Sequence, residues 1–271
     1  MTPEDFDKLQ GLLATRAGYR LTRDRIHLAE HRLGPIARRE GYANVEALLA
    51  NLWAHPVASL GWAVIEALLN AETWFRRDRT PFTVLEKELL PALGRARANG
   101  RVRVWSAGCS TGQEAWSIAM TGHEIGVPLD LVATDLSQRA IEKARSGVYT
   151  GFEIQRGLTA QTMLRWFEPI EDNWRVRDEL ADTVRFGRAN LLDEPTDEAR
   201  FDVIFCRNVL GDMEPSRRAR VLDGLERRLV DDGCLFLGAD ERLEGETVAF
   251  RPVSGRKGLY VKSPSTLRRA A

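Results

Sequence analysis

A strand-like apolar segment runs into a glycine-containing turn, which opens directly into a helix, over residues 104–120. Gly108 and Gly112 have no side chains, so the backbone can bend sharply and a ligand can lie against exposed N–H groups. The helix that follows points its positive end at whatever occupies the turn. A second strand ends at Asp135, 23 residues after Gly112, about where a doubly wound nucleotide-binding fold places the carboxylate that holds a ribose diol. These residue types and spacings predict a site for an adenosine-type cofactor.

The turn lacks the features that bind a pyrophosphate. Its glycines are spaced Gly-x-x-x-Gly rather than Gly-x-Gly-x-x-Gly, and it carries no Gly-Lys-Ser/Thr motif. A ligand with an adenosine but no pyrophosphate fits better than NAD or ATP, so S-adenosylmethionine is the expected cofactor, and a nicotinamide dehydrogenase is disfavoured. The alternative is a plain strand-to-helix turn without a ligand. The acid at the end of the second strand counts against that alternative.

The elements that must position these residues follow a change of pattern along the chain. Over roughly the first 75 residues, apolar residues recur at helical spacing, with breaks near Gly18, Gly41 and Pro56. Strand and helix patterns then alternate, with strands expected at 101–106, 129–134, 201–208, 234–239 and near 259, and helices at 82–93, from 113, from 138 and at 215–229. We therefore expect a helical N-terminal domain, residues 1–78, and a doubly wound, Rossmann-like α/β domain, residues 79–271. A small antiparallel β-subdomain is expected within the second domain at about residues 150–188.

Composition argues against several classes of protein. Lys+Arg and Asp+Glu number 39 each, so a general attraction to nucleic acid or to an anionic membrane is not indicated. The first ten residues are acidic and polar, unlike a secretory signal, and the most apolar window, residues 60–69, is too short for a membrane span. The three cysteines are scattered, and His27 and His31 share a helical face without a third ligand. We expect a reduced, cytoplasmic protein with no metal, no nucleic-acid partner and no membrane insertion.

Several separated blocks carry a resemblance to a known family. They are ETWFRRD (72–78), AGCSTGQEAWSIAM (107–120), ATDLSQRAIEKARSGVY (133–149), and FDVIFCRNVL (201–210) followed by DDGCLFLGADERL (231–243). The motif Asn190-Leu191-Leu192 also matches, and RLGPIARREG (32–41) extends the likeness into the helical segment. Together these blocks resemble the bacterial chemotaxis receptor glutamate methyltransferases, the CheR family, over nearly the whole chain.

The resemblance implies an S-adenosylmethionine methyltransferase that forms glutamate methyl esters on chemoreceptors and releases S-adenosylhomocysteine. The implied partner is the cytoplasmic helical domain of chemoreceptors. The implied cofactor-binding residues are Thr73, Arg77, Gly108, Glu114, Asp135, Asn190, Leu191, Arg207 and Asn208. By position, Arg77 would lie at the carboxylate end of the cofactor, which makes it the catalytic candidate. Asp135 would hold the ribose, and Asn190 and Leu191 would lie at the adenine.

These residues also have purely structural interpretations. Arg77 lies in a charged run and could form a solvated surface pair. Asp135 could cap the helix that begins near Ser137, and Glu114 would favour a helix dipole in any protein. Asn208 could be a turn residue.

A basic stretch is the candidate surface for docking the acceptor. Seven arginines, among them Arg38 and Arg39, crowd residues 16–39 against two acidic residues. Such a face would steer an acidic receptor helix by charge complementarity. An ordinary solvated helix face is the alternative.

Several positions depart from the family's pattern. Ala71 stands where the family has Asn, Gln113 where it has Glu, and Asp212 where it has a tyrosine near the methyl group. A carboxylate at position 212 could pair with the sulfonium or with Arg77, but it would repel an incoming glutamate. Two rival functions therefore stay open. One is the same cofactor with a different acceptor, and the other is a non-catalytic module that senses S-adenosylmethionine.

Overall fold

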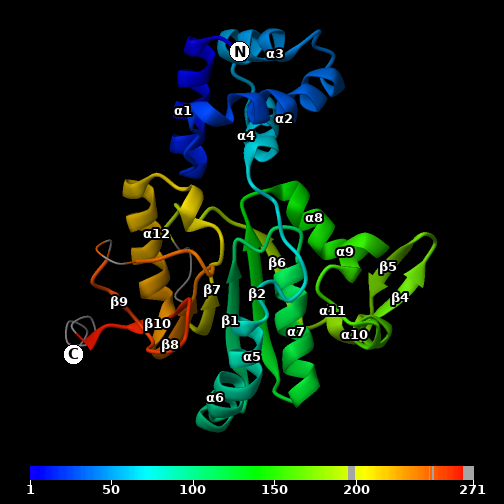
Figure 1. The fold of residues 1–271 in the computed structure, drawn as a ribbon, viewed down its shortest axis with the longest axis vertical. Coiled ribbons are helices and arrows are strands. Elements are labelled where there is room, and N and C mark those ends of the chain that lie inside the picture. The colour runs from blue at the N-terminus through cyan, green and yellow to red at the C-terminus, as the bar shows by residue number, and fades with distance from the viewer. Residues whose placement is uncertain (195–198, 244, 246, 265–271) are drawn as a thin grey trace. The chain divides into compact units, whose positions relative to one another are not determined.

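The computed structural model describes residues 1–194, 199–243, 245 and 247–264, and it divides into two compact units (Figure 1). One unit is formed by Met1–Asn70 with Asp212–Arg218, and the other by Ala71–Gly211 with Ala219–Ala271. Residues 71–78, which the sequence boundary placed in the helical domain, therefore cluster with the second unit.

The first unit is a bundle of helices. They are α1 (Pro3–Ala17), α2 (Ile26–Arg39), α3 (Val45–Ala54) and α4 (Ala58–Leu68), with a 3₁₀ turn, η1 (Arg23–Arg25), before α2. Thr2 caps α1 in a capping box with Asp5, and Gly18 ends α1 in a left-handed conformation, with φ of 68°. Helical spacing predicts the apolar stripes that are buried here, including Leu9, Leu13, Leu33, Leu48 and Leu49. The chain returns to this unit at residues 212–218, where Met213 forms a β-bridge with Tyr19.

The second unit is built on a seven-stranded sheet in the order β6-β2-β1-β7-β8-β10-β9. Its strands are β1 (Val102–Ala107), β2 (Leu129–Asp135), β6 (Val184–Arg188), β7 (Phe201–Phe205), β8 (Leu229–Phe236), β9 (Phe250–Pro252) and β10 (Leu259–Lys262). The first five strands in this order run parallel; β10 is antiparallel to β8, and β9 is antiparallel to β10. The mainly parallel α/β sheet predicted from the alternating pattern is confirmed.

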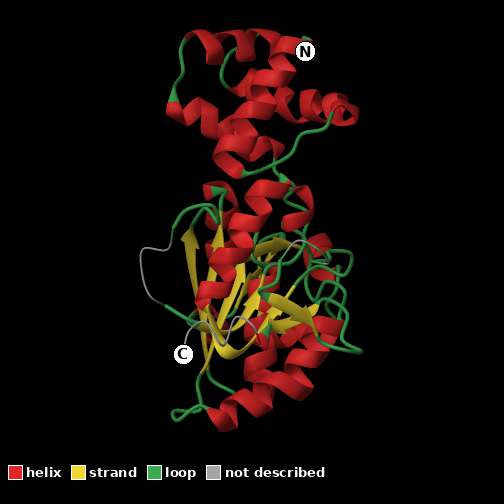
Figure 2. Cartoon of the chain, turned by 90° about the vertical axis from the view of Figure 1, so that its left-hand side faces the viewer, coloured by secondary structure: helices red, strands yellow, loops and turns green. Residues whose placement is uncertain are grey.

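Helices cover both faces of this sheet (Figure 2). They are α5 (Thr80–Val84), the π-helical segment η2 (Leu85–Leu89), α6 (Leu90–Ala96), α7 (Gln113–Ile125), α8 (Gln138–Ser146) and α12 (Pro215–Arg228), which follows the short 3₁₀ turn η3 (Leu210–Asp212). Successive side chains of β1 point to opposite faces. Val104 packs in the core that contains α7, whereas Trp105 lines a cavity with Val221 and Leu225 of α12. Because both faces are covered, most side chains of the central strands are apolar and buried.

A separate antiparallel sheet in the order β3-β5-β4 forms the β-subdomain. Its elements are β3 (Val148–Thr150), α9 (Gly151–Gln155), α10 (Ala160–Trp166), β4 (Phe167–Ile170) and β5 (Asn173–Val176), and α11 (Asp178–Ala181) follows. The prediction that the subdomain extends to residue 188 is wrong for β6, which pairs parallel with β2 of the main sheet. Phe186 of β6 packs edge-on against Trp116 of α7, with ring centroids 5.1 Å apart, so burial ties this strand to the main core.

The strand order reverses at β1. The chain passes from β1 to β2 on one side of it, and β7 lies on the other side. The carboxyl ends of β6, β2, β1 and β7 therefore lie next to one another, and the loops that follow them meet at one edge. An open α/β sheet binds its ligand at such a reversal point.

Candidate cofactor and acceptor site

The loop after β1 has no room for side chains at its two glycines. Gly108 and Gly112 have φ of 85° and 96°, a region that favours glycine. A Cβ at Gly108 would lie 2.5 Å from Cγ2 of Val209, and one at Gly112 would lie 2.8 Å from Cβ of Ala144. The Gly108 N–H donates to the Thr134 carbonyl oxygen at 2.8 Å, which fixes the loop to the end of β2. The loop therefore presents bare backbone at the edge where a ligand is expected.

Asp135 ends β2 and joins two neighbouring loops. Its Oδ2 accepts the Ser110 N–H at 2.8 Å, and its Oδ1 accepts the Ser137 N–H at 2.9 Å. Ser137 caps α8 through its own side chain, which accepts the Ala140 N–H at 3.1 Å. The cap of α8 is thus supplied by Ser137. The Asp135 carboxylate lies beside the glycine loop, at the position where the sequence predicts a ribose ligand.

Segment 71–78 packs against the glycine loop and α7. The Ser110 hydroxyl donates to the Ala71 carbonyl oxygen at 2.9 Å, and the Arg76 N–H donates to Oγ of Ser117 at 2.9 Å. Arg76 and Asp78 have positive φ, 49° and 64°. Such conformations persist outside glycine only where the surroundings hold them. These contacts fix the segment in one conformation at the strand ends.

Arg76 forms an ion pair with Glu124 of α7. Its Nη2 donates to both oxygens of Glu124, at 2.8 and 2.7 Å. The Arg76 and Glu124 side chains are 24% and 23% exposed. Glu124 also accepts Nε1–H of Trp166 from α10 at 3.2 Å. This ion pair, together with the Trp166 hydrogen bond, joins segment 71–78, α7 and the β-subdomain.

Arg77 is partly buried at the end of this segment. Its guanidinium carbon lies 4.3 Å from the centroid of the Trp74 ring, and its Nη1 donates to the Glu72 carbonyl oxygen at 3.0 Å. Its Nε is buried and has no hydrogen-bond partner within the described residues. Thr73 lies half-buried in the same segment. A guanidinium with an unused buried donor is suited to binding a carboxylate.

Arg207 links segment 71–78 to the ends of the strands. Its side chain is 1% exposed, and its Nη1 donates to Oε2 of Glu114 at 3.1 Å. Its Nη2 donates to Oδ2 of Asp78 at 2.6 Å and to the Arg77 carbonyl oxygen at 2.9 Å. Oε1 of Glu114 accepts the Ser106 hydroxyl at 2.8 Å. Burial raises the pKa of Glu114, and the Arg207 guanidinium opposes that rise.

This arrangement assigns Arg207 and Glu114 a definite task. Both were predicted as cofactor ligands, and the structure brings them together in a buried ion pair behind the backbone of Arg77. Arg207 also binds the Arg77 carbonyl oxygen, so the ion pair with Glu114 anchors the backbone of segment 71–78.

Asn208 follows β7 in a left-handed conformation, with φ of 59°. The carboxylate of Glu241, in the loop after β8, accepts the N–H groups of Asn208, Gly211 and Gly238 at 2.7, 3.0 and 2.7 Å. Oδ1 of Asn208 is buried without a hydrogen-bond partner in the described part of the chain. Glu241 was not singled out from the sequence. In the sequence, the signal for Glu241 is that it lies three residues after Gly238, which follows a strand.

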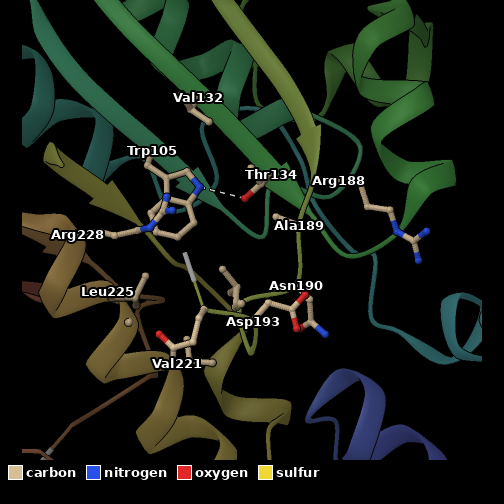
Figure 3. A pocket seen from close by; sticks show the side chains of 13 residues that line it. Trp105, Val132, Thr134, Arg188, Ala189, Asn190, Asp193, Val221, Leu225 and Arg228 are labelled. Carbon is tan, nitrogen blue, oxygen red and sulfur yellow. Dashed lines mark hydrogen bonds between the residues drawn. The ribbon is translucent and has the colours of Figure 1, made fainter. Parts of the chain in front are cut away.

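A cavity of about 260 Å³ lies between β1, β2, the loop after β6 and α12 (Figure 3). Asn190 and Leu191, predicted to lie at the adenine, line it together with Trp105 and Thr134. Nε1–H of Trp105 donates to Oγ1 of Thr134 at 2.9 Å. The Ala189 N–H, next to Asn190, donates to the Asp135 carbonyl oxygen at 3.0 Å. The structure therefore brings the predicted adenine and ribose residues to the same edge.

The candidate docking residues, Arg38 and Arg39, lie exposed at the end of α2 in the first unit. Arg39 pairs with Glu40 at 2.8 Å, and Arg38 lines a hollow with Glu30 and Glu46. Several other arginines of the basic stretch are engaged within the unit: Arg23 with Asp7, Arg25 with Asp212, and Arg32 with the carbonyl oxygens of Leu68 and Leu69. The basic face is therefore smaller than the sequence suggests.

Asp212, at the family's tyrosine position, has a charged partner. Its Oδ1 accepts Nη1–H of Arg25 at 3.1 Å, and its side chain is 23% exposed. This pairing partly neutralises the charge of the Asp212 carboxylate.

The described residues show neither a metal cluster nor a membrane helix. No three His, Cys, Asp or Glu side chains among them form a group that could hold a metal ion. No helix in the described ranges is long and apolar enough to cross a membrane. Burial raises the pKa values of the Cys109 and Cys206 thiols well above the ordinary value, so neither is a ready thiolate nucleophile.

The site is typical of one class of enzymes, the S-adenosylmethionine-dependent methyltransferases. It combines a glycine loop at the reversal point of a parallel sheet with an aspartate at the end of the next strand, and its glycine loop lacks the motifs that bind a pyrophosphate. Residues 71–259 match a family model described as "CheR methyltransferase, SAM binding domain". The chain therefore belongs to the CheR methyltransferase family.

Relatives match over nearly the whole chain. It is 32% identical over 268 residues to chemotaxis protein methyltransferase Cher2 of Pseudomonas putida, a match that covers 96% of this chain and 98% of that protein. It is 33% identical over 271 residues to the chemotaxis protein methyltransferase of Vibrio parahaemolyticus, covering 97% and 98%. A probable biofilm formation methyltransferase, WspC of Pseudomonas aeruginosa, is 37% identical over 187 residues, covering 66% of this chain and 43% of that protein. The predictions of an S-adenosylmethionine cofactor and of a CheR-type methyltransferase are confirmed.

Proposed function

We propose that this protein methylates glutamate side chains in the cytoplasmic helical domain of chemoreceptors, and that it works in the cytoplasm. The observation that carries the proposal is the link from the buried Arg207 to Glu114, Asp78 and the Arg77 carbonyl oxygen, which anchors the segment that bears Arg77. Relatives named as chemotaxis protein methyltransferases, matched over nearly the whole chain, support the choice of acceptor.

The residues at the strand ends fit a cofactor with an adenosine at one end and an amino acid at the other. A Cβ at Gly108 or Gly112 would collide with Val209 or Ala144, so only glycine allows the loop to pack this closely at the strand ends. The buried Nε of Arg77 and the buried Oδ1 of Asn208 are left without partners among the described residues. Arg77 would hold the carboxylate of the amino-acid end, and Asp135 the ribose diol.

The chemistry requires alignment and the exclusion of water more than a base. When bound, the cofactor supplies an electrophilic methyl group on a sulfonium. A glutamate acceptor, with an ordinary pKa of about 4.3, is already ionised at neutral pH and can attack directly. Opposite charges neutralise each other along this reaction, so a dry, pre-aligned site favours the transition state. The Glu114 carboxylate is occupied by Arg207 and Ser106, consistent with a site that uses no general base.

Labelling of receptors tests the proposal. Incubation with methyl-labelled S-adenosylmethionine and purified chemoreceptor cytoplasmic fragments should give label that alkali releases as methanol. Fragments whose acceptor glutamates are changed to glutamine should stay unlabelled, and the Arg77→Gln protein should label poorly. Tight cofactor binding without label on any receptor fragment would contradict the proposal and favour the cofactor-sensing module.

A different acceptor for the same cofactor is the second candidate. It is favoured by Asp212, a carboxylate at the position where the family has a tyrosine near the methyl group. The same labelling reaction, with receptors replaced by other acidic proteins or small carboxylic acids, distinguishes the two. Faster labelling of one of these than of every receptor fragment would support the second candidate.

A further inference from the structure

Two arginines from distant parts of the second unit stack on one indole ring. The guanidinium carbons of Arg77 and Arg156 lie 4.3 and 4.0 Å from the centroid of the Trp74 ring. The guanidinium groups of Arg77 and Arg156 therefore both contact the same ring. Arg77 is half-buried, whereas Arg156 is exposed. The ring thus places an exposed positive charge next to the guanidinium that is proposed to hold the cofactor.

The loop that carries Arg156 is held against segment 71–78 by its backbone. Gly157 has φ of 110°, and a Cβ there would overlap the Phe75 carbonyl oxygen. The Phe75 side chain is fully buried and packs edge-on against Tyr149 and Phe167 of the β-subdomain, with centroid distances of 5.2 and 5.5 Å. Packing therefore fixes the position of this loop independently of the contacts that the Arg156 side chain makes.

Arg156 already binds a carboxylate in this structure. Its Nη2 donates to Oε1 of Glu72 at 2.8 Å, and the two side chains are 42% and 55% exposed. The hydrogen bond from Arg156 lowers the pKa of Glu72, so the pair is ionic at neutral pH. An exposed pair of this kind contributes little to stability. A carboxylate from another molecule can therefore replace Glu72 at small cost.

We propose that Arg156, seated on Trp74, is a specificity residue that binds an acidic side chain flanking the methylated glutamate, and that Glu72 holds this place in the free enzyme. The inference rests on the proposed function, in which Arg77 marks the carboxylate end of the cofactor. Arg156 reads a neighbouring acid rather than the reacting one, because a charge-assisted hydrogen bond to the attacking carboxylate would stabilise the ground state. The acceptor class is thus an acidic segment with at least two carboxylates close together.

Steady-state kinetics with a chemoreceptor fragment test this role. Arg156→Gln should raise the KM for the fragment about three- to tenfold at low salt and leave the cofactor dissociation constant unchanged. Glu72→Gln removes the competing carboxylate and should lower the same KM. A purely structural role predicts that both variants change in the same direction, because both break the same ion pair. Equal changes of KM and of melting temperature in the two variants would therefore overturn the proposal.

A matched control and an altered acceptor complete the test. Arg175 forms an ion pair of similar exposure with Glu168 inside the three-stranded sheet, so Arg175→Gln should leave the acceptor KM unchanged. Changing the acids that flank the acceptor glutamate to glutamine should raise the KM of the wild type but hardly that of Arg156→Gln. If both respond equally to the flanking acids, Arg156 does not read them and the inference is wrong. If the wild type methylates no receptor fragment, the proposed function itself fails.

Discussion

Replacing Arg207 with methionine should lower the free energy of unfolding of the second unit by about 3–5 kcal/mol. Arg207 is 1% exposed, and its partner Glu114 has a side chain only 11% exposed, so methionine leaves a buried carboxylate without its counter-charge. Asp78 also loses a partner, but its side chain is 33% exposed and can turn to water. The cost therefore falls chiefly on Glu114. Urea denaturation followed by tryptophan fluorescence measures it.

The pH dependence of this loss identifies Glu114 as its cause. Burial raises the pKa of Glu114 while Arg207 opposes the rise, so the pKa climbs further when Arg207 is removed. A carboxyl whose pKa is higher in the folded state contributes stability below its unfolded value, and that stability is lost as pH rises through the folded pKa. The deficit of Arg207→Met should therefore shrink as pH falls from about 8 to about 5. Adding Glu114→Gln should restore most of the loss.

A surface pair provides the matched control. Arg256 pairs with Glu88, and the two side chains are 43% and 48% exposed, so Arg256→Met should cost less than about 1 kcal/mol. If Arg207→Met costs no more than this control at neutral pH, the argument from burial is refuted. A large deficit that does not change with pH, or that Glu114→Gln fails to relieve, would show that the uncompensated carboxylate is not its source.

Three further changes probe the cofactor edge and the acceptor. Asp135→Ala should weaken S-adenosylmethionine binding in calorimetry by about 1–3 kcal/mol, as expected for a lost buried hydrogen-bond partner; an unchanged affinity would remove Asp135 from the ribose. Gly112→Ala puts a Cβ 2.8 Å from Cβ of Ala144 at a φ of 96°, so both the melting temperature and the cofactor affinity should fall. Wild-type values of both would show that the loop can shift to accommodate the extra methyl group. Asp212→Tyr removes a carboxylate that Arg25 only partly neutralises and should raise the rate of receptor methylation. A rate that does not rise would show that electrostatic repulsion at position 212 does not limit the reaction.

The glycine loop and Asp135 could be predicted because short-range geometry fixes them. Gly108 and Gly112 have positive φ, a conformation that favours glycine, so the residue type itself indicates the turn. An acid at the end of an apolar strand lies at the ligand edge of any parallel sheet. The family resemblance implies that Asn190 lies at the adenine, and the pairing of β6 with β2 brings the loop that carries Asn190 next to the end of β2.

The contacts that hold the site together could not be predicted, because they join residues far apart in the chain. Arg207 and Glu114 are separated by 93 positions, and Arg156 and Glu72 by 84. Each charge on its own is indistinguishable from a solvated surface residue. The strand β6 was misassigned for the same reason: its alternating pattern shows that it is a strand but does not identify its neighbour.

The contact between Arg76 and Glu124 has a consequence for how this sequence can change. Placing an aromatic residue at position 76 alone would leave Glu124 sheltered beside Trp166 with its principal cation gone. Neutralising Glu124 alone would instead leave the partly buried Arg76 guanidinium without its counter-charge. Positions 76 and 124 are therefore coupled: a substitution at one is tolerated only together with a compensating substitution at the other.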